Sequence, residues 1–296
     1  MRHSQSTIKD KTDISALNNK SQFKEVITHI ALYTELIIMS VIVLFPILWI
    51  VGSSFNPGNS LASSRFIPQN PTLNHYINLI QNTNYLRWYW NTFKIAVITM
   101  VINVFLSTSL GYIFGRFNFK FKKTALLSVM ILQIFPSFMA MTALYVLFLT
   151  FNLLDNHWAL ILLYSAGQIP FNTWLIKGYL SSVPKELDES AMLDGASKFQ
   201  TFRYVVFPLM KPIISFVAVT NFMVPWMDFI FPRLIISTNS NFTLAIGLFD
   251  MINGNASNQY TSFAAGAVLV ALPITCIYVF LQKYLIEGIM AGASKG

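Results

Sequence analysis

Long stretches without charged residues alternate with shorter polar segments along most of this chain. A helix needs about 20 mostly apolar residues to cross the hydrocarbon core of a membrane. Six segments approach or exceed that length, and they cover residues 30–51, 95–115, 124–150, 157–176, 212–236 and 263–280. The pattern predicts an all-α, polytopic membrane protein with about six transmembrane helices.

Two of these segments carry further signals. Trp88, Tyr89 and Trp90 precede the second segment, and such aromatic residues are typical of the boundary between membrane and water. Pro136 interrupts the third segment and predicts a kink, because proline removes one backbone hydrogen bond of a helix. The third segment is also long enough to tilt or to break within the membrane.

We expect one transmembrane domain over residues 30–284, with a cytosolic tail at each end. Residues 1–29 are predicted to form a mobile tail, since the first 24 lack the apolar centre of a cleavable signal peptide. Residues 285–296 are expected to form the second tail. Two longer outer loops, residues 52–89 and 237–260, are either solvated connectors or contacts for a partner outside the membrane.

The placement of Lys and Arg predicts the orientation of the chain. Basic residues near spans are retained on the cytosolic side, and 16 of the 20 Lys and Arg residues fall in segments that this rule places inside. The outer segments hold only Arg65, Arg87, Lys94 and Arg233. Both termini are therefore predicted to be cytosolic.

The composition agrees with a lipid environment. The chain is 54% hydrophobic and 11% charged, with a mean hydropathy of +0.55, whereas soluble domains carry about 25% charged residues. Its net charge of +8 does not indicate nucleic acid as a partner, because no basic run is interleaved with aromatic residues. Cys276 and the four histidines have no metal-ligand spacing. The sequence therefore predicts no metal, no cofactor and no catalytic residues.

A polar segment over residues 182–211 is the most informative part of the chain. Glu186, Asp188 and Glu189 fall in the first turns of a short predicted helix, where negative charge is stabilising. Gly195 can adopt the positive φ that closes such a helix. The segment predicts a compact helical pair on the cytosolic face, suited to docking into a groove of another protein.

A second amphipathic helix is expected directly after Gly195. Phe199, Phe202 and Val206 recur at helical spacing, and Pro208 stops the run before the fifth span.

This segment resembles the cytosolic motif of binding-protein-dependent ABC importer permeases. That motif reads Glu-Ala-Ala, three residues, Gly, nine residues and Ile-x-Leu-Pro, and this chain keeps every spacing with three conservative departures at Ser190, Val205 and Phe207. The resemblance implies that the motif residues contact an ATPase subunit. They are Glu189, Ser190, Ala191, Gly195, Val205, Phe207 and Pro208.

Other segments narrow the resemblance to carbohydrate permeases, especially those of the maltose and maltodextrin type. They are Trp174–Tyr179, Phe242–Gly247, Ala271–Thr275 and Ala291–Gly296. Trp226–Phe229 resembles a further element of sugar permeases, with Met227 where Asn is frequent. Galactosides and other oligosaccharides remain alternative cargoes.

The resemblance implies an assembly in a bacterial cell membrane. Its other members would be a second homologous permease chain, two ATP-binding subunits on the cytosolic face and an extracytoplasmic sugar-binding protein. The chain contains no Gly-Lys-Ser or Gly-Lys-Thr phosphate loop. ATP hydrolysis is therefore expected from a separate polypeptide, although a secondary carrier or a channel is a rival interpretation of six spans alone.

Polar side chains inside the apolar segments are candidates for a translocation pathway, because lipid offers them no partner. They are Gln133, Gln168, Asn172, Asn221 and Asp228. Hydrogen bonding between helices is an equally good explanation for any one of them. Asp228 has Arg233 five residues further on as a candidate ion-pair partner.

Overall fold

The computed structural model describes residues 3–59, 66–134, 137–253 and 259–293. Over these ranges every regular element is a helix. The predicted all-α class is therefore confirmed, as expected for a chain that must satisfy its backbone hydrogen bonds without help from water.

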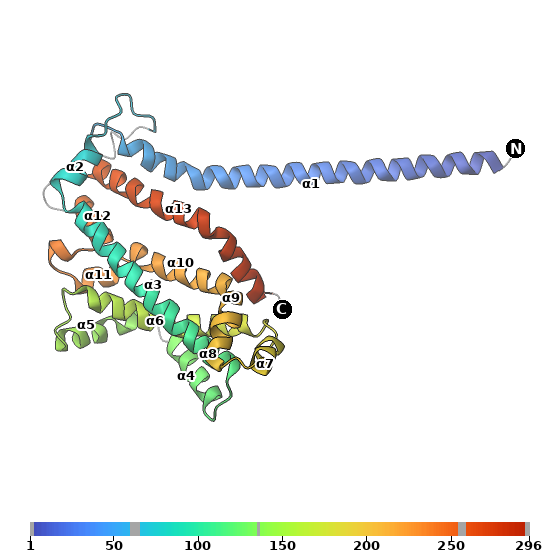
Figure 1. The fold of residues 1–296 in the computed structure, drawn as a ribbon. Coiled ribbons are helices and arrows are strands. Elements are labelled where there is room, and N and C mark those ends of the chain that lie inside the picture. The colour runs from blue at the N-terminus through green and yellow to red at the C-terminus, as the bar shows by residue number, and fades with distance from the viewer. Residues whose placement is uncertain (1–2, 60–65, 135–136, 254–258, 294–296) are drawn as a thin grey trace.

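Three long helices form the centre of the molecule. α3 (Tyr85–Arg116) packs against α6 (His157–Leu180) and α10 (Lys211–Met227), and α13 (Tyr260–Ala293) packs on α10. α1 (His3–Ser54) packs on α13 and extends far beyond the remaining helices, as Figure 1 shows.

Close contact between α3 and α6 depends on a small residue. A Cβ atom added at Gly111 would lie 2.5 Å from Cγ2 of Ile176, closer than real Cβ contacts allow. Ile176 and the nearby Leu180 are fully buried in the same core cluster. The two helices can therefore approach closely because position 111 has no side chain, as is usual where membrane helices meet.

Shorter helices complete the fold. They are α2 (Asn74–Asn82), α4 (Lys122–Ile134), α5 (Met141–Thr150), α7 (Glu186–Leu193), α8 (Lys198–Gln200), α9 (Phe207–Leu209), α11 (Ile230–Ile235) and α12 (Leu244–Asn253). Two 3₁₀ segments, Ser137–Ala140 and Asn239–Asn241, and one π-helical segment, Thr201–Val206, lie between them. α4 and α7 lie at one end of the molecule and α2 at the other (Figure 1).

Four helices of the described chain are long and apolar enough to cross a membrane: Val26–Ser54, Tyr85–Arg116, His157–Leu180 and Tyr260–Phe280. A fifth span arises if Lys198–Leu209 and Lys211–Met227, which meet at 75°, are taken together. The structure thus departs from six uninterrupted spans, although the multi-pass character is the same.

The third and fifth predicted spans account for this departure. The third divides into α4 and α5, and Pro136, the expected cause of a kink, lies outside the described residues. The fifth ends at Met227 because residue 228 is extended, and the chain then continues into the short α11. Broken helices are tolerated at membrane depth where their backbone lines a cavity or is buried in protein.

Other boundaries also differ from the sequence prediction. α3 begins at Tyr85, so Trp88, Tyr89 and Trp90 belong to the helix itself rather than preceding it. The expected tail over residues 1–29 is helical from His3 onward, since no glycine or proline interrupts it. The last helix continues to Ala293, which includes most of the second expected tail.

In the predicted outer loop over residues 237–260, the described part up to residue 253 is a packed element rather than a solvated connector. Its helix α12 buries Leu244, Ile246 and Leu248, and Gly247 lies directly against the ring of Trp88 on α3. Any side chain at position 247 would collide with that ring.

Asp155 connects the turn between α5 and α6, through hydrogen bonds, to the segment that follows α11. Its Oδ1 accepts hydrogen bonds from the backbone N–H groups of Ser237 (3.0 Å) and Thr238 (2.9 Å), and Asn241 Nδ2 donates to Oδ2 at 3.2 Å. Burial alone would raise the pKa of Asp155, but these hydrogen bonds outweigh it and lower the pKa from its ordinary value. The carboxylate therefore stays ionised and holds this corner together.

Candidate functional site

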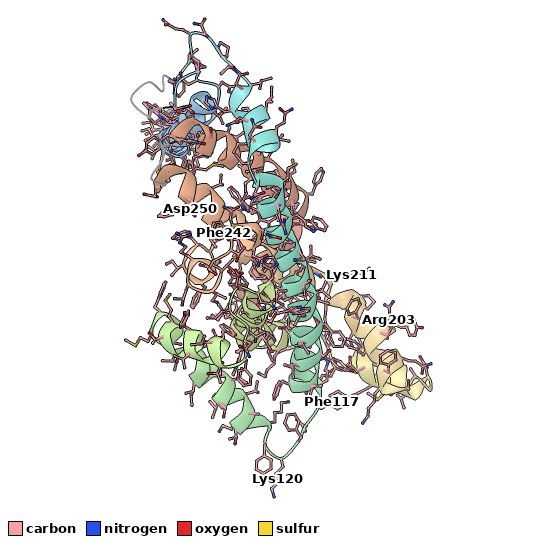
Figure 2. All side chains as sticks on the ribbon, turned by 90° about the vertical axis from the view of Figure 1, so that its left-hand side faces the viewer. Phe117, Lys120, Arg203, Lys211, Phe242 and Asp250 are labelled. Carbon is pink, nitrogen blue, oxygen red and sulfur yellow. The ribbon has the colours of Figure 1, made fainter. Side chains whose placement is uncertain are left out.

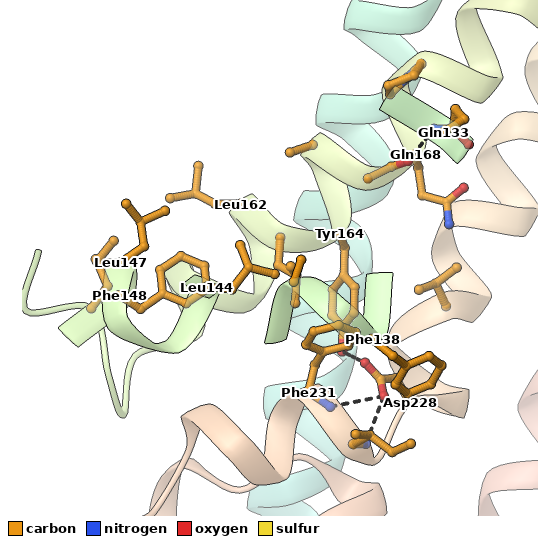
Figure 3. Close-up of a pocket in the computed structure, with 18 of the residues that line it drawn as sticks. Gln133, Phe138, Leu144, Leu147, Phe148, Leu162, Tyr164, Gln168, Asp228 and Phe231 are labelled. Atoms are coloured by element: carbon orange, nitrogen blue, oxygen red, sulfur yellow. Dashed lines mark hydrogen bonds between the residues drawn. The ribbon is translucent and has the colours of Figure 1, made fainter. Parts of the chain in front are cut away.

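A cavity of about 1100 Å³ lies between the broken helices and α6. Its walls come from α4, α5, α6, α10 and α11 and are mainly apolar and aromatic, including Phe138, Phe148 and Phe231. The polar side chains on this wall are Gln133, Tyr164, Gln168 and Asp228. Figure 3 shows the hydroxyl of Tyr164 directed at Asp228 and the two glutamines together at another part of the cavity. Aromatic faces with a few convergent polar groups are typical of a ligand site.

Asp228 lies where α10 ends and stabilises the break in the helix. Its Oδ2 accepts a hydrogen bond from the Tyr164 hydroxyl at 2.9 Å, and its Oδ1 accepts one from the backbone N–H of Ile230 at 2.9 Å. The carboxylate thus satisfies a backbone donor at the start of α11 that no preceding turn can satisfy. An acid inside an apolar segment is explained here by its role in ending one helix and beginning the next.

The predicted pairing of Asp228 with Arg233 is wrong. Arg233 instead forms an ion pair with Asp250 of α12, with Nη1 and Oδ2 3.2 Å apart. The helix is interrupted between the two predicted partners, so their sequence spacing does not bring them together.

Gln133 joins α4 to α6. Its Nε2 donates to the backbone carbonyl of Gly167 at 3.1 Å, and Gln168 is the next residue along α6. The structure therefore brings Gln133, Gln168 and Asp228 to one cavity, as the pathway hypothesis requires.

Asn172 and Asn221 do not line this cavity. They are 2% and 1% exposed, and Asn221 Nδ2 donates to the backbone carbonyl of Val217 on its own helix at 2.7 Å. Among the described residues neither side chain makes the hydrogen bond between helices that the alternative interpretation expects, because Asn172 Nδ2 and Asn221 Oδ1 have no partner.

The motif segment over residues 182–211 forms the helix–turn–helix that the sequence predicts. Gly195 has φ +89°, and the N–H groups of Gly195 and Ala196 donate to Met192 O and Ala191 O at 3.1 and 3.0 Å. These two hydrogen bonds close α7 in a Schellman motif, which requires a left-handed residue at the glycine position. Ser197 then begins α8 in a reciprocal capping box with Gln200.

The motif residues lie on the surface of this helical pair. Glu189, Ser190, Gly195 and Pro208 are exposed, and Ala191, Val205 and Phe207 are partly buried. Large apolar side chains are exposed beside them, with Leu193 88% and Tyr204 73% exposed. Figure 2 shows this end of the molecule, with Arg203 on its outer side. An exposed surface of this kind fits a protein contact.

Phe199, Phe202 and Val206, which recur at helical spacing, differ in burial. Phe199 is 71% exposed and adds to the outward surface, whereas Val206 is fully buried. Phe202 packs on Tyr112 of α3 with ring centroids 4.6 Å apart. The segment is thus anchored on α3 by Phe202, while Phe199 stays available to a partner.

An ion pair that the sequence reasoning missed fixes α7 to the membrane helices. Arg116 at the end of α3 pairs with Asp188 at 2.8 Å, and the two side chains are 6% and 8% exposed. The same guanidinium donates to the carbonyls of Leu180 and Val183, both at 3.1 Å. Burial raises the pKa of Asp188, and Arg116 opposes that shift. One side chain therefore joins α3, the end of α6 and α7.

Among the described residues no three His, Cys, Asp or Glu side chains gather closely enough to hold a metal ion. The structure instead combines a mainly apolar and aromatic cavity, with a few polar side chains, and an exposed helical pair fixed to the end of the helical body. These features are typical of a membrane transport subunit.

Comparison with known proteins identifies the family. Residues 107–290 match the family described as binding-protein-dependent transport system inner membrane component, and the chain belongs to this family. The resemblance stated from the sequence motif is confirmed.

Two characterised relatives come from Bacillus subtilis (strain 168). The galactooligosaccharides transport system permease protein GanQ is 43% identical over 89% of this chain and 94% of its own length. The maltodextrin transport system permease protein MdxG is 39% identical over 90% of this chain and 96% of its own length. The maltodextrin transport system permease protein MalD of Streptococcus pneumoniae (strain ATCC BAA-255 / R6) is 37% identical over 95% of this chain and its whole length.

A solved structure supports the fold independently. One chain in the crystal structure of a bacterial ABC transporter involved in the import of the acidic polysaccharide alginate superimposes with a TM-score of 0.78 and 20% identity. The match covers 87% of this chain and 96% of that chain.

We predict that Asp188→Ala will lower the free energy of unfolding by about 3–5 kcal/mol, because the buried Arg116 would lose its counter-charge. Thermal unfolding in detergent and tryptic cleavage at Lys185 and Lys198 would measure the loss. Glu189→Ala, at the exposed neighbouring position, should change stability by no more than about 0.5 kcal/mol. Replacing both partners, Arg116→Met with Asp188→Leu, should recover much of the loss. Equal stability of Asp188→Ala and the parent chain would contradict the role of this ion pair.

Proposed function

We propose that this chain is the membrane permease subunit of an ABC importer that carries an oligosaccharide into the cytoplasm. The observation that carries the proposal is extensive similarity to permeases named for galactooligosaccharide and maltodextrin transport, together with a polar and aromatic cavity inside the helical body. Maltodextrins and galactooligosaccharides are the cargo classes that these relatives suggest.

The cavity is proposed as this chain's share of the translocation pathway. Sugars present hydroxyl groups that need hydrogen-bond partners and apolar C–H faces that pack on aromatic rings. Gln133, Gln168 and Asp228 supply the first kind of contact, and Phe138 and Phe231 supply the second. Sugar released from a carrier protein could pass such a wall without meeting a fully apolar barrier.

The proposed assembly contains a second permease chain, two ATP-binding subunits and an extracytoplasmic sugar-binding protein. One structural relative is the bacterial alginate ABC transporter in complex with an alginate pentasaccharide-bound periplasmic protein, with a TM-score of 0.63 and 18% identity. ATP hydrolysis is assigned to the separate subunits, and the exposed motif residues between Glu189 and Pro208 are proposed as their docking site.

The test of the transport proposal is uptake by the reconstituted assembly, with ATP inside the vesicles and loaded binding protein outside. Gln168→Leu should reduce uptake of maltodextrin or galactooligosaccharide by roughly tenfold, because a sugar hydroxyl in the cavity would lose a hydrogen bond worth about 1.5 kcal/mol. The rate is measured with labelled sugar.

Gln282→Leu provides the matched control, since Gln282 is exposed on α13 and does not line the cavity. It should transport like the parent chain. Unchanged uptake by Gln168→Leu would remove this cavity from the pathway, and uptake that persists without ATP would favour a secondary carrier or a channel.

We place both termini and the motif segment in the cytosol, because Lys and Arg are concentrated on that side. Single cysteines at Leu193 and Gln69, introduced after Cys276→Ala, should react with impermeant reagents applied to opposite faces. Both positions are exposed. Labelling of both from the same face would contradict the orientation.

Gly195→Asp tests the docking site. No atom lies within 4 Å of the place where a Cβ would stand, so the chain itself has room for a side chain. The left-handed backbone adds strain of only about 1 kcal/mol. We therefore expect the variant to fold but to lose sugar uptake and transport-coupled ATP hydrolysis, measured in the reconstituted assembly.

Gly195→Ala carries the strain without the charge and should impair coupling less than Gly195→Asp. Co-purification of the ATP-binding subunits separates lost docking from lost folding. Parent-like uptake by an assembled Gly195→Asp complex would refute the docking assignment.

A further inference from the structure

A second cavity, of about 740 Å³, lies at the motif end of the molecule, apart from the proposed pathway. It is bounded by the end of α3, the start of α4, the end of α6 and the residues before α7. Its lining is strongly basic and includes Arg116, Lys120, Lys122, Lys123, Lys177 and Lys185. Figure 2 shows Lys120 at the tip of the connection between α3 and α4.

The positive charge of this cavity is largely uncompensated by the chain. Arg116 is paired with Asp188, but within the described residues no lysine of the lining comes within 4 Å of a carboxylate oxygen. Glu186 is the one acid on the wall. Like charges gathered on one wall repel one another, and an anion entering the cavity would relieve that repulsion.

Two of these lysines contact neighbouring groups. Lys122 Nζ donates to the backbone carbonyl of Phe117 at 2.9 Å, and Lys177 Nζ lies 4.9 Å from the ring centroid of Trp174. Trp174 in turn donates from Nε1 to the carbonyl of Leu126 at 3.3 Å. These contacts restrain two of the lysine side chains on the cavity wall.

An apolar strip leads away from the cavity along α4. Leu126 belongs to the cavity wall, and Leu127 and Ile131 are 48% and 65% exposed. Residues 127 and 131 lie one turn apart on the same helix face. A basic cavity continued by an exposed apolar strip matches a molecule with an anionic head and hydrocarbon chains.

We propose that this cavity binds the phosphate group of an anionic phospholipid from the surrounding leaflet, with acyl chains lying along α4. Basic pockets between membrane helices on the cytosolic side are suited to such headgroups. Pro184, Lys185 and Glu186 form part of the wall immediately before α7. Bound lipid would therefore stabilise the residues that precede α7. This role is separate from sugar passage and ATPase contact.

The experiment measures how much phosphatidylglycerol the purified full-length chain retains in detergent, by native mass spectrometry, and compares the parent chain with two double variants. The first variant is Lys123→Gln with Lys185→Gln, and its expected affinity is roughly 30-fold lower than that of the parent, about fivefold for each lysine. Arg87→Gln with Lys94→Gln removes the same charge at the other end of α3 and should retain lipid like the parent. Thermal unfolding without added lipid verifies that both variants fold.

A second arm identifies the source of the phosphate. Inorganic phosphate should neither raise the unfolding temperature of the lipid-free chain nor displace phosphatidylglycerol at millimolar concentration. Displacement by inorganic phosphate would replace the lipid with a soluble phosphate and overturn the proposal. Equal lipid retention by the two double variants would also overturn the proposal. So would a variant with Lys123→Gln and Lys185→Gln that retains lipid but no longer binds the ATP-binding subunits, because the lysines would then serve a protein contact.

Discussion

The exclusion of water from the hydrocarbon core governs this structure, since every backbone N–H and C=O group there must find a partner in the protein. Long helices meet this requirement over most of α3, α6 and α13. Where a helix breaks, a side chain replaces the missing backbone acceptor: Asp228 Oδ1 accepts hydrogen bonds from the backbone N–H groups of Ile230 and Phe231 at the start of α11. The aromatic and polar cavity adjoins these breaks. The same interruptions that depart from an ideal span therefore border the cavity that we propose as part of the translocation pathway.

The helix α6 contacts both the cavity and the region where the motif segment is anchored. Its middle carries Tyr164 and Gln168 on the cavity wall, and its end supplies the Leu180 carbonyl to Arg116. Arg116 also holds Asp188 of α7 at 2.8 Å. Moving α7 away from α3 would separate a buried ion pair, which is costly because each charge would lose its partner.

Local signals predicted the helix–turn–helix of residues 182–211 well, but not the contacts that anchor it. Gly195 was recognisable because closing α7 with a left-handed residue is a local requirement, and the family motif marked the same residue. The pair of Arg116 and Asp188 joins positions far apart in the chain, so it depends on how α3 and α6 pack. The expected pairing of Asp228 with Arg233 failed for a related reason, since a break in the helix redirected the second side chain toward Asp250. Within the segment over residues 237–260, polar residues obscured the apolar positions Leu244, Ile246 and Leu248 that hold α12 in the core.

The pairing of the first and last long helices bears on how the protein is made. Few residues of α1 between Val26 and Ser54 are buried in the described chain, and the main neighbour of α1 is α13, which begins about 200 residues later. A ribosome working from the N-terminus inserts α1 long before that neighbour exists. Because a helix makes its backbone hydrogen bonds within itself, α1 can be stable in the bilayer before α13 is present. The packing of α13 on α1 is then a late step of biogenesis. Until that step, the side of α1 that later contacts α13 faces lipid.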